Sequence, residues 1–233
     1  MLKLFQPKRA FGLPCPSAFC VKLELYLRMA DIPYELEAGE PTDAPKGKVP
    51  WIVDGDVSLG DSTFIIEYLK EHYGDPLDSW LSDEQQATGH VIKRMLEDSL
   101  YFVSSYSKWA DDESFKIYAA ELFAGMPAEQ QAYVPDMVRG KVLEKFNAQG
   151  VGRHTTEEVY QIGCKDVASF AVLLADNEYL LGDRPSSFDA SAFGVIGNIK
   201  DGPFPSPVRD MLRETPNVAA YIDHLRSAWF SDV

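Results

Sequence analysis

Residues 47–62 read GKVPWIVDGDVSLGDS, and this stretch decides the fold. The apolar run Val49–Val53 predicts a strand, Asp54–Asp56 is a tight-turn signal, and Val57–Leu59 returns as a second strand. Asp61 and Ser62 are residues that cap helices, and the residues after them have helical apolar spacing. The stretch therefore predicts a β-hairpin that leads directly into a helix.

The residues before this stretch predict a strand, a loop, a helix and a second strand. Leu2 and Leu4 open an apolar strand, and a loop rich in proline and glycine follows and ends at Ser17. From there apolar residues recur at helical spacing up to about Ala30, and Tyr34–Glu37 alternates like a strand. The predicted order is therefore βαβ followed by ββα, an α/β arrangement.

Beyond residue 76 the pattern changes, because no segment alternates with period two and long amphipathic stretches dominate. We therefore expect an α/β domain over residues 1–76 and an all-helical domain over residues 77–233. The helices are predicted near 83–109, 112–124, 134–148, 155–177, 187–199 and 216–229. Ser186 with Asp189 predicts a capped start for the fifth of them.

Charge and cysteine content limit the classes of partner. The chain has 22 Lys and Arg against 36 Asp and Glu, a net charge of -14, which argues against nucleic-acid and anionic-membrane binding. The three cysteines have no metal-ligand spacing, and no apolar run is long enough to span a bilayer. These features predict a cytoplasmic protein without a metal.

Four motifs in this order resemble the glutathione transferase superfamily: Ser17–Lys22 at the first helix, Gly47–Pro50 before the hairpin, Asp61–Ser62, and Ser186 with Asp189. The resemblance covers nearly the whole chain. It implies a thioredoxin-like first domain (βαβ-ββα) and an all-α second domain. The chain departs from the pattern at Ala18, where a proline is usual, so the helix start is less preset.

Within the superfamily, three further segments look most like the branch of failed axon connections proteins and metaxins. They are Gly150–His154, Gly182–Pro185 and Phe188–Ala190. The resemblance therefore implies two functions. One is an enzyme that activates the glutathione thiol for conjugation to a small hydrophobic electrophile or for thiol exchange. The other is a non-catalytic binding or adaptor protein with the same fold.

The resemblance also implies the roles of individual residues. Ser17 is the catalytic candidate, because a hydroxyl donor at a helix N-terminus stabilises a thiolate by a charge-assisted hydrogen bond and by the helix dipole. The alternatives are that Ser17 only caps its helix, or that the thiol of Cys15 does the chemistry. The implied glutathione-binding residues are Lys48, Val49, Pro50, Asp61 and Ser62.

The implied geometry of that site is specific. A cis peptide bond before Pro50 would expose the backbone of Val49 to an extended peptide. Asp61 and Ser62 would hold the ammonium and a carboxylate of glutathione at a helix start. Glutathione is then a co-substrate, and the resemblance implies a homodimer.

Overall fold

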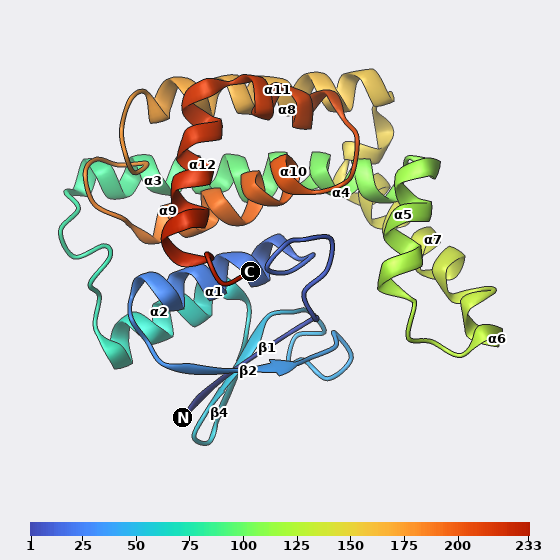
Figure 1. Cartoon of the computed structure of the whole chain (residues 1–233), viewed down its shortest axis with the longest axis horizontal. Coiled ribbons are helices and arrows are strands. Elements are labelled where there is room, and N and C mark those ends of the chain that lie inside the picture. The colour runs from blue at the N-terminus through green and yellow to red at the C-terminus, as the bar shows by residue number, and fades with distance from the viewer.

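A computed structural model describes all 233 residues, and the predicted hairpin lies at one side of its only sheet (Figure 1). Strand β3 pairs antiparallel with β4, β1 pairs antiparallel with β3, and β1 pairs parallel with β2. The sheet order is therefore β2-β1-β3-β4. The elements of this layer are β1 (Leu2–Gln6), α1 (Ala18–Met29), β2 (Tyr34–Ala38), β3 (Trp51–Asp54), β4 (Val57–Gly60) and α2 (Ser62–Tyr73). This order confirms the predicted βαβ-ββα arrangement.

Helices α1 and α2 lie between the sheet and most of the remaining helices, which form the upper layers of Figure 1, while the helices of residues 112–149 extend to the right. Most of α1 is buried because it packs both on the sheet side and against α9 (Ser187–Ala192) and the π-helical turn η3 (Phe193–Gly197). Gly194 permits this crossing, since a Cβ there would stand 2.5 Å from the carbonyl oxygen of Ala18. The start of α1 is therefore fixed by direct backbone contact with the helical layer.

The rest of the chain is helical, as predicted. Residues 83–109 form one continuous helix made of α3 (Asp83–Met95), the π-helical segment η1 (Leu96–Leu100) and α4 (Tyr101–Trp109). The other helices are α5 (Asp112–Leu122), α6 (Ala128–Gln131), α7 (Val134–Gln149), the 3-10 turn η2 (Val151–Arg153), α8 (Thr156–Leu174), α10 (Asn198–Asp201), α11 (Pro207–Glu214) and α12 (Pro216–Trp229).

The helix prediction differs from the structure in three details, one of which is that the four-residue helix α6 was not predicted. Helix α8 ends at Leu174, earlier than predicted, because Ala175 adopts a positive φ of 51° that a helix cannot continue. Helix α11 was not predicted, because its eight residues follow a loop rich in Pro and Gly that hides the helical spacing. Helices α8 and α11 are both more than a hundred residues after Ser17 in the sequence.

The predicted helix start at Ser186 is confirmed, and it is more than a cap. The carboxylate of Asp189 is fully buried and accepts hydrogen bonds from the backbone N–H of Ser186 at 2.8 Å and of Leu180 at 2.7 Å. The hydroxyls of Ser186 and Tyr221 also donate to it, each at 2.7 Å. Burial raises the pKa of Asp189, and these four donors act in the opposite direction. Asp189 therefore joins three segments of the helical layer.

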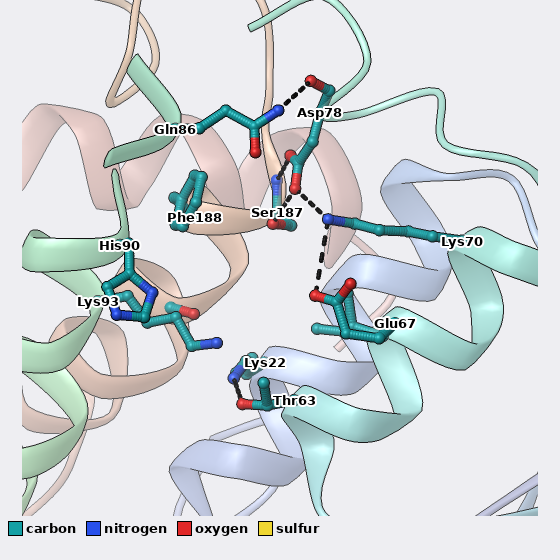
Figure 2. Close-up of a pocket in the computed structure, with 12 residues that line it drawn as sticks. Lys22, Thr63, Glu67, Lys70, Asp78, Gln86, His90, Lys93, Ser187 and Phe188 are labelled. Atoms are coloured by element: carbon teal, nitrogen blue, oxygen red, sulfur yellow. Dashed lines mark hydrogen bonds and ion pairs between the residues drawn. The ribbon is translucent and has the colours of Figure 1, made fainter. Parts of the chain in front are cut away.

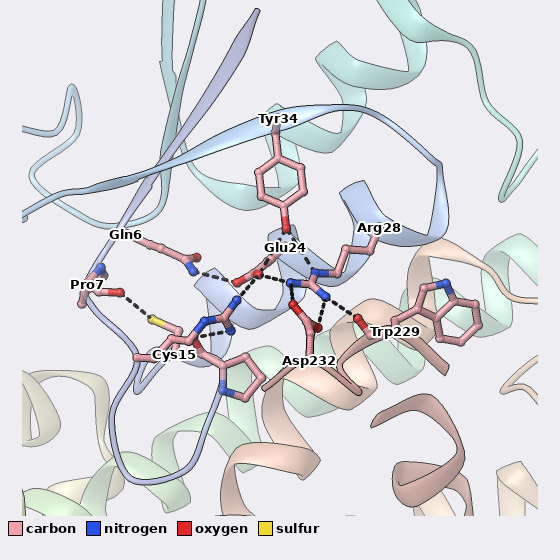
Figure 3. A network of polar contacts seen from close by, with 10 residues as sticks. Gln6, Pro7, Cys15, Glu24, Arg28, Tyr34, Trp229 and Asp232 are labelled. Carbon is pink, nitrogen blue, oxygen red and sulfur yellow. Dashed lines mark hydrogen bonds and ion pairs between the residues drawn. The ribbon is translucent and has the colours of Figure 1, made fainter. Parts of the chain in front are cut away.

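A second buried carboxylate fixes the loop between β1 and α1. Glu24, on α1, is fully buried and accepts from Gln6 at 2.8 Å and from Arg9 at 3.1 Å (Figure 3). It also accepts from Arg28 at 3.0 Å and from Tyr34 at 3.1 Å. The spacing of Glu24 and Arg28 suggests a surface pair, but the carboxylate faces inward because α1 is covered on both sides.

Replacement of Asp189 by Ala should destabilise the protein by about 3 to 5 kcal/mol, because buried donors lose a charged acceptor. Chemical denaturation in urea measures this change. The matched control is Asp210→Ala, since Asp210 is paired with Arg209 but is 61% exposed. Its cost should stay below about 1 kcal/mol. If Asp189→Ala unfolds like the control, Asp189 does not hold these segments together.

Replacement of Glu24 by Leu should also cost about 3 to 5 kcal/mol, because it leaves the buried amide of Gln6 and the partly buried guanidinium groups of Arg9 and Arg28 without their shared acceptor. Urea unfolding again provides the measurement. Glu37→Leu is the control, since Glu37 pairs with Lys3 at 3.1 Å but both side chains are more than 40% exposed, at 43% and 42%. An equal loss of stability in the two variants would contradict a special role of Glu24.

Candidate functional site

The sequence motifs of the first domain meet at one end of the sheet, where strands β1 and β4 finish and β3 begins. Trp51, the first residue of β3, pairs with Gly60, the last residue of β4, and with Phe5 near the end of β1. The residues just before β3 and just after β4 and β1 therefore lie at the same end of the sheet. This register brings together Val49 and Pro50, Asp61 and Ser62, and the loop that ends at Ser17.

Ser17 precedes α1 with extended backbone angles, φ -94° and ψ 120°, and its hydroxyl makes no capping hydrogen bond. Its carbonyl accepts from the N–H groups of Cys20 and Val21, so the helix begins normally without using the hydroxyl. Ser17 is half-buried. The hydroxyl therefore stands at the positive end of a twelve-residue helix without capping it.

The thiols near Ser17 are both buried. The Cys15 side chain is fully buried and its Sγ lies 3.8 Å from the carbonyl oxygen of Pro7, to which it donates (Figure 3). Asn198 donates to the carbonyl of Cys15 at 3.1 Å, which fixes this part of the loop. Burial raises the pKa of Cys20 well above its ordinary value, although Ser17 lowers it. Neither thiol is presented to solvent, in contrast to Ser17.

The peptide bond between Val49 and Pro50 is cis, as predicted. The backbone N–H and C=O of Val49 have no hydrogen-bond partner in the protein, although Val49 is half-buried. Buried or half-buried backbone groups are rarely left unpaired unless water or a ligand satisfies them. The backbone of Val49 is thus suited to pairing with an extended ligand just before the start of β3.

Asp61 is a strained residue at the start of α2. It is not glycine, yet its φ is 83°, and its carboxylate accepts from the N–H of Thr63 at 3.0 Å. Strained backbone of this kind occurs most often at ligand sites. Asp61 is exposed, whereas Ser62 is 4% exposed, so the two offer a carboxylate and a hydroxyl at different depths.

Two lysines lie in the loop before β3: Lys48, which was predicted to bind glutathione, and Lys46. Lys48 is exposed and forms no ion pair, and the ammonium of Lys46 lies 4.4 Å from the centre of the Phe64 ring. Lys46 also lies beside Gly60, just before the predicted helix-start site for an anion. Val49, Pro50, Asp61 and Ser62 therefore lie at the same end of the sheet, and Ser17 and Asp61 stand at the starts of α1 and α2.

Aromatic side chains connect the loop and first turn around Ser17 with α4 and α5. Phe11, in the loop before α1, stacks on Tyr118 of α5 with ring centres 5.7 Å apart and contacts Phe204 at 5.3 Å. Phe19 contacts Tyr101 of α4 at 4.7 Å. This aromatic group is the apolar part of the candidate site.

The sequence analysis did not identify Phe11, Lys108, Tyr118 or Phe204. One signal was available for Lys108, which follows Tyr101 and Ser105 at helical spacing and so shares their face of α4. Phe11 and Phe204 lie in loops, where no periodicity shows which way a side chain points. Their contact is a tertiary feature that only the fold reveals.

A polar pocket of about 190 Å³ lies between α1, α2, α3 and α9 (Figure 2). Its polar groups largely satisfy one another: Lys70 donates to Asp78 at 2.6 Å, and Asp78 accepts from the backbone of Ser187 at 2.7 Å. Lys22, at the pocket wall, lies 2.7 Å from Glu97. These contacts join the two layers, and none of the predicted catalytic residues lines this pocket.

Two family models match the chain. They are described as the glutathione S-transferase N-terminal domain, over residues 18–114, and the glutathione S-transferase C-terminal domain, over residues 163–225. Among curated proteins, the chain is 31% identical to an isoprene-epoxide glutathione S-transferase of a Rhodococcus species, covering 98% of this chain and 99% of that protein. It is 27% identical to failed axon connections of Drosophila melanogaster, covering all of this chain and 59% of that protein.

Solved structures show the same fold. The β-etherase LigF of a Sphingobium species superposes with a TM-score of 0.65 at 20% identity, covering 100% of this chain and 99% of that chain. A glutathione S-transferase of Methylobacterium radiotolerans, solved with glutathione sulfonate, superposes with a TM-score of 0.63 at 20% identity, covering 99% of this chain and 93% of that chain.

The expected cytoplasmic location is wrong as a plain assignment. Several relatives are metaxins, among them the mitochondrial outer membrane import complex protein METAXIN of Arabidopsis thaliana, 26% identical over 94% of this chain and 70% of that protein. These relatives point away from a plain cytoplasmic location. The cysteine pattern indicates only reducing surroundings and cannot separate one reducing compartment from another.

No helix of the chain is both long enough and apolar enough to cross a membrane. The fold, the two family models and the Rhodococcus relative agree along nearly the full length of the sequence. The chain belongs to the glutathione S-transferase family.

Proposed function

We propose that the protein is a glutathione transferase that binds glutathione as co-substrate and joins its sulfur to a small apolar electrophile. The observation that carries the proposal is the hydroxyl of Ser17, which stands at the start of α1 without capping it. A thiol of ordinary pKa is mostly protonated at neutral pH, and a hydroxyl donor at a helix N-terminus favours its thiolate. Ser17 is the catalytic residue of the proposal.

The other predicted residues, at the end of the sheet, suit the peptide part of glutathione. The unpaired backbone of Val49 can pair with an extended ligand, as in strand addition. The exposed carboxylate of Asp61 suits the ammonium, and Ser62 with the first amides of α2 suits the adjacent carboxylate. Lys48 is assigned to the second carboxylate, because its ammonium is exposed and unpaired.

The electrophile is proposed to be an epoxide. The aromatic group formed by Phe11, Phe19, Tyr101 and Tyr118 offers an apolar surface beside Ser17. The Rhodococcus relative, which is named for an isoprene epoxide, supports this class. We also propose that the chain divides into domains at residues 1–76 and 77–233. We further propose a homodimer, which is supported by the exposed apolar side chains of Phe64 (60% exposed) and Val91 (67% exposed).

A second candidate function is a binding or adaptor protein without turnover. The matches to failed axon connections and to the metaxins favour it, because those relatives are not named as transferases. The two functions differ in one measurable respect. An enzyme must shift the ionisation of bound glutathione, whereas an adaptor need not.

Replacement of Ser17 by Ala should leave the fold intact and raise the pKa of the bound glutathione thiol by about one to two units, the equivalent of about 1.5 to 3 kcal/mol. Thiolate absorbance measured against pH reports this shift. Conjugation of glutathione to styrene oxide at neutral pH should fall by about ten- to a hundredfold, with glutathione affinity changed much less.

Two further variants serve as controls. Ser62→Ala should weaken glutathione binding, measured as a smaller thermal shift at millimolar glutathione, without moving the thiol pKa. Cys15→Ala should leave both readouts unchanged. An identical thiol titration in Ser17→Ala and wild type would refute the catalytic role of Ser17, and loss of activity in Cys15→Ala would place the chemistry on that sulfur. Binding without any turnover would favour the adaptor.

A further inference from the structure

The side chain of Lys108, on α4, is largely buried, and its ammonium keeps some contact with solvent but has no counter-ion. Three lysines are buried in the chain, with exposures of 2% for Lys22, 8% for Lys108 and 9% for Lys200. Lys22 lies 2.7 Å from Glu97, and Lys200 lies 2.6 Å from Asp223. Lys108 has no carboxylate within ion-pair distance and no hydrogen bond, and burial is the main influence on it.

The surroundings of the Lys108 ammonium are aromatic. The centre of the Phe204 ring is 5.6 Å from Nζ, and Phe204 contacts Phe11 and Tyr118 with ring centres 5.3 and 5.6 Å away. A ring face attracts a cation, but this attraction is much smaller than the cost of burying an unpaired charge. Lys108 is therefore the largely buried lysine that no carboxylate compensates, whereas Lys22 and Lys200 are each paired.

The titratable groups around Lys108 come from each neighbouring element. Cys15 lies on the loop before α1, Cys20 on α1, Tyr101 on α4 itself and Tyr118 on α5. Behind α4, on α7 and α8, are Arg139, which pairs with Asp112 at 2.7 Å, and Tyr160. Burial raises the pKa of Tyr101, Tyr118 and Tyr160, and burial lowers the pKa of Lys108 to about 8.

Lys108 also lies next to the loop that carries Ser17. Cys15, which acts on the charge of Lys108, is two residues before Ser17, and Phe11 belongs to the same loop. Phe19, two residues after Ser17, contacts Tyr101, which shares a face of α4 with Lys108. The unpaired ammonium and the loop that carries Ser17 therefore belong to one region, which also holds the aromatic group.

We infer that Lys108 binds the oxygen of the second substrate and protonates it during the reaction. The inference rests on the proposed function and deepens it. The glutathione thiolate attacks an epoxide carbon, the new C–S bond forms, and the C–O bond breaks with its electron pair left on oxygen. That alkoxide takes a proton from Nζ of Lys108, and the neutral amine then regains a proton from water. Lys108 is thus a catalytic residue, and the substrate is an apolar epoxide.

The test compares two electrophiles with the same carbon skeleton, styrene oxide and phenethyl bromide. Bromide leaves without a proton, so only the epoxide needs Lys108. In Lys108→Met, kcat for styrene oxide should fall by about a hundredfold, with KM changed by less than about threefold. The rate with phenethyl bromide and the thiolate titration of bound glutathione should stay within about twofold of wild type. Lys116→Met, on the exposed part of α5, is the matched control.

The pH dependence provides a second readout. Lys108 acts in its protonated form, which is present below its pKa and lost above it. In wild type, kcat for styrene oxide should therefore decline as pH rises through about 8. This decline should be absent with phenethyl bromide and in Lys108→Met. Lys108→Arg keeps the charge but cannot release a proton at these pH values, so it should keep KM and lose kcat.

Three results would overturn the inference. The first is an unchanged styrene oxide rate in Lys108→Met. The second is an equal loss with both electrophiles, which would indicate a structural role. The third is competitive inhibition by phenylacetate that disappears in Lys108→Met while epoxide turnover persists, which would mean that Lys108 binds a permanent anion. If wild type instead conjugates neither electrophile, the proposed function fails, and this inference fails with it.

Discussion

The buried carboxylate of Glu24 is the constraint on which the geometry of the site depends. It lies on α1 and receives donors from β1, from the loop after β1, from its own helix and from β2. Arg28, one of these donors, also binds Asp232 and the carbonyl of Trp229, each at 2.6 Å, near the C-terminus (Figure 3). The loop that ends at Ser17 therefore cannot move independently of α1, and the chain end is tied to the same charge.

The two ends of the site are held by different physical means. The side with Val49 and Asp61 is set by β-sheet register, since Trp51 must face Gly60 for the hairpin to close. The side with Ser17 is set by close packing of α1 on η3 at Gly194 and by the hydrogen bond from Asn198 to Cys15. The helical layer thus positions the start of α1 relative to the end of the sheet that carries Val49 and Asp61. A site of this kind needs both layers.

Local signals were sufficient for the elements and for part of the site. Asp54–Asp56 and Asp61–Ser62 act within a few residues, so the hairpin and the start of α2 could be predicted from sequence alone. The cis bond before Pro50 followed from the resemblance and is present. Long-range contacts could not be predicted in this way. The inward position of Glu24 depends on both layers that cover α1, and the pairing of Phe11 with Tyr118 joins segments about a hundred residues apart.

The distribution of unpaired polar groups bears on the choice between enzyme and adaptor. Elsewhere in the interior, charges are compensated: Lys22 by Glu97, Lys200 by Asp223 and Asp189 by four donors. The backbone of Val49 and the ammonium of Lys108 have no such partners. An apolar residue in place of Lys108 would serve a purely structural fold better, because an uncompensated buried charge destabilises it. An unpaired backbone at the end of the sheet and an unpaired ammonium on α4 are the arrangement expected where a ligand completes the pairing.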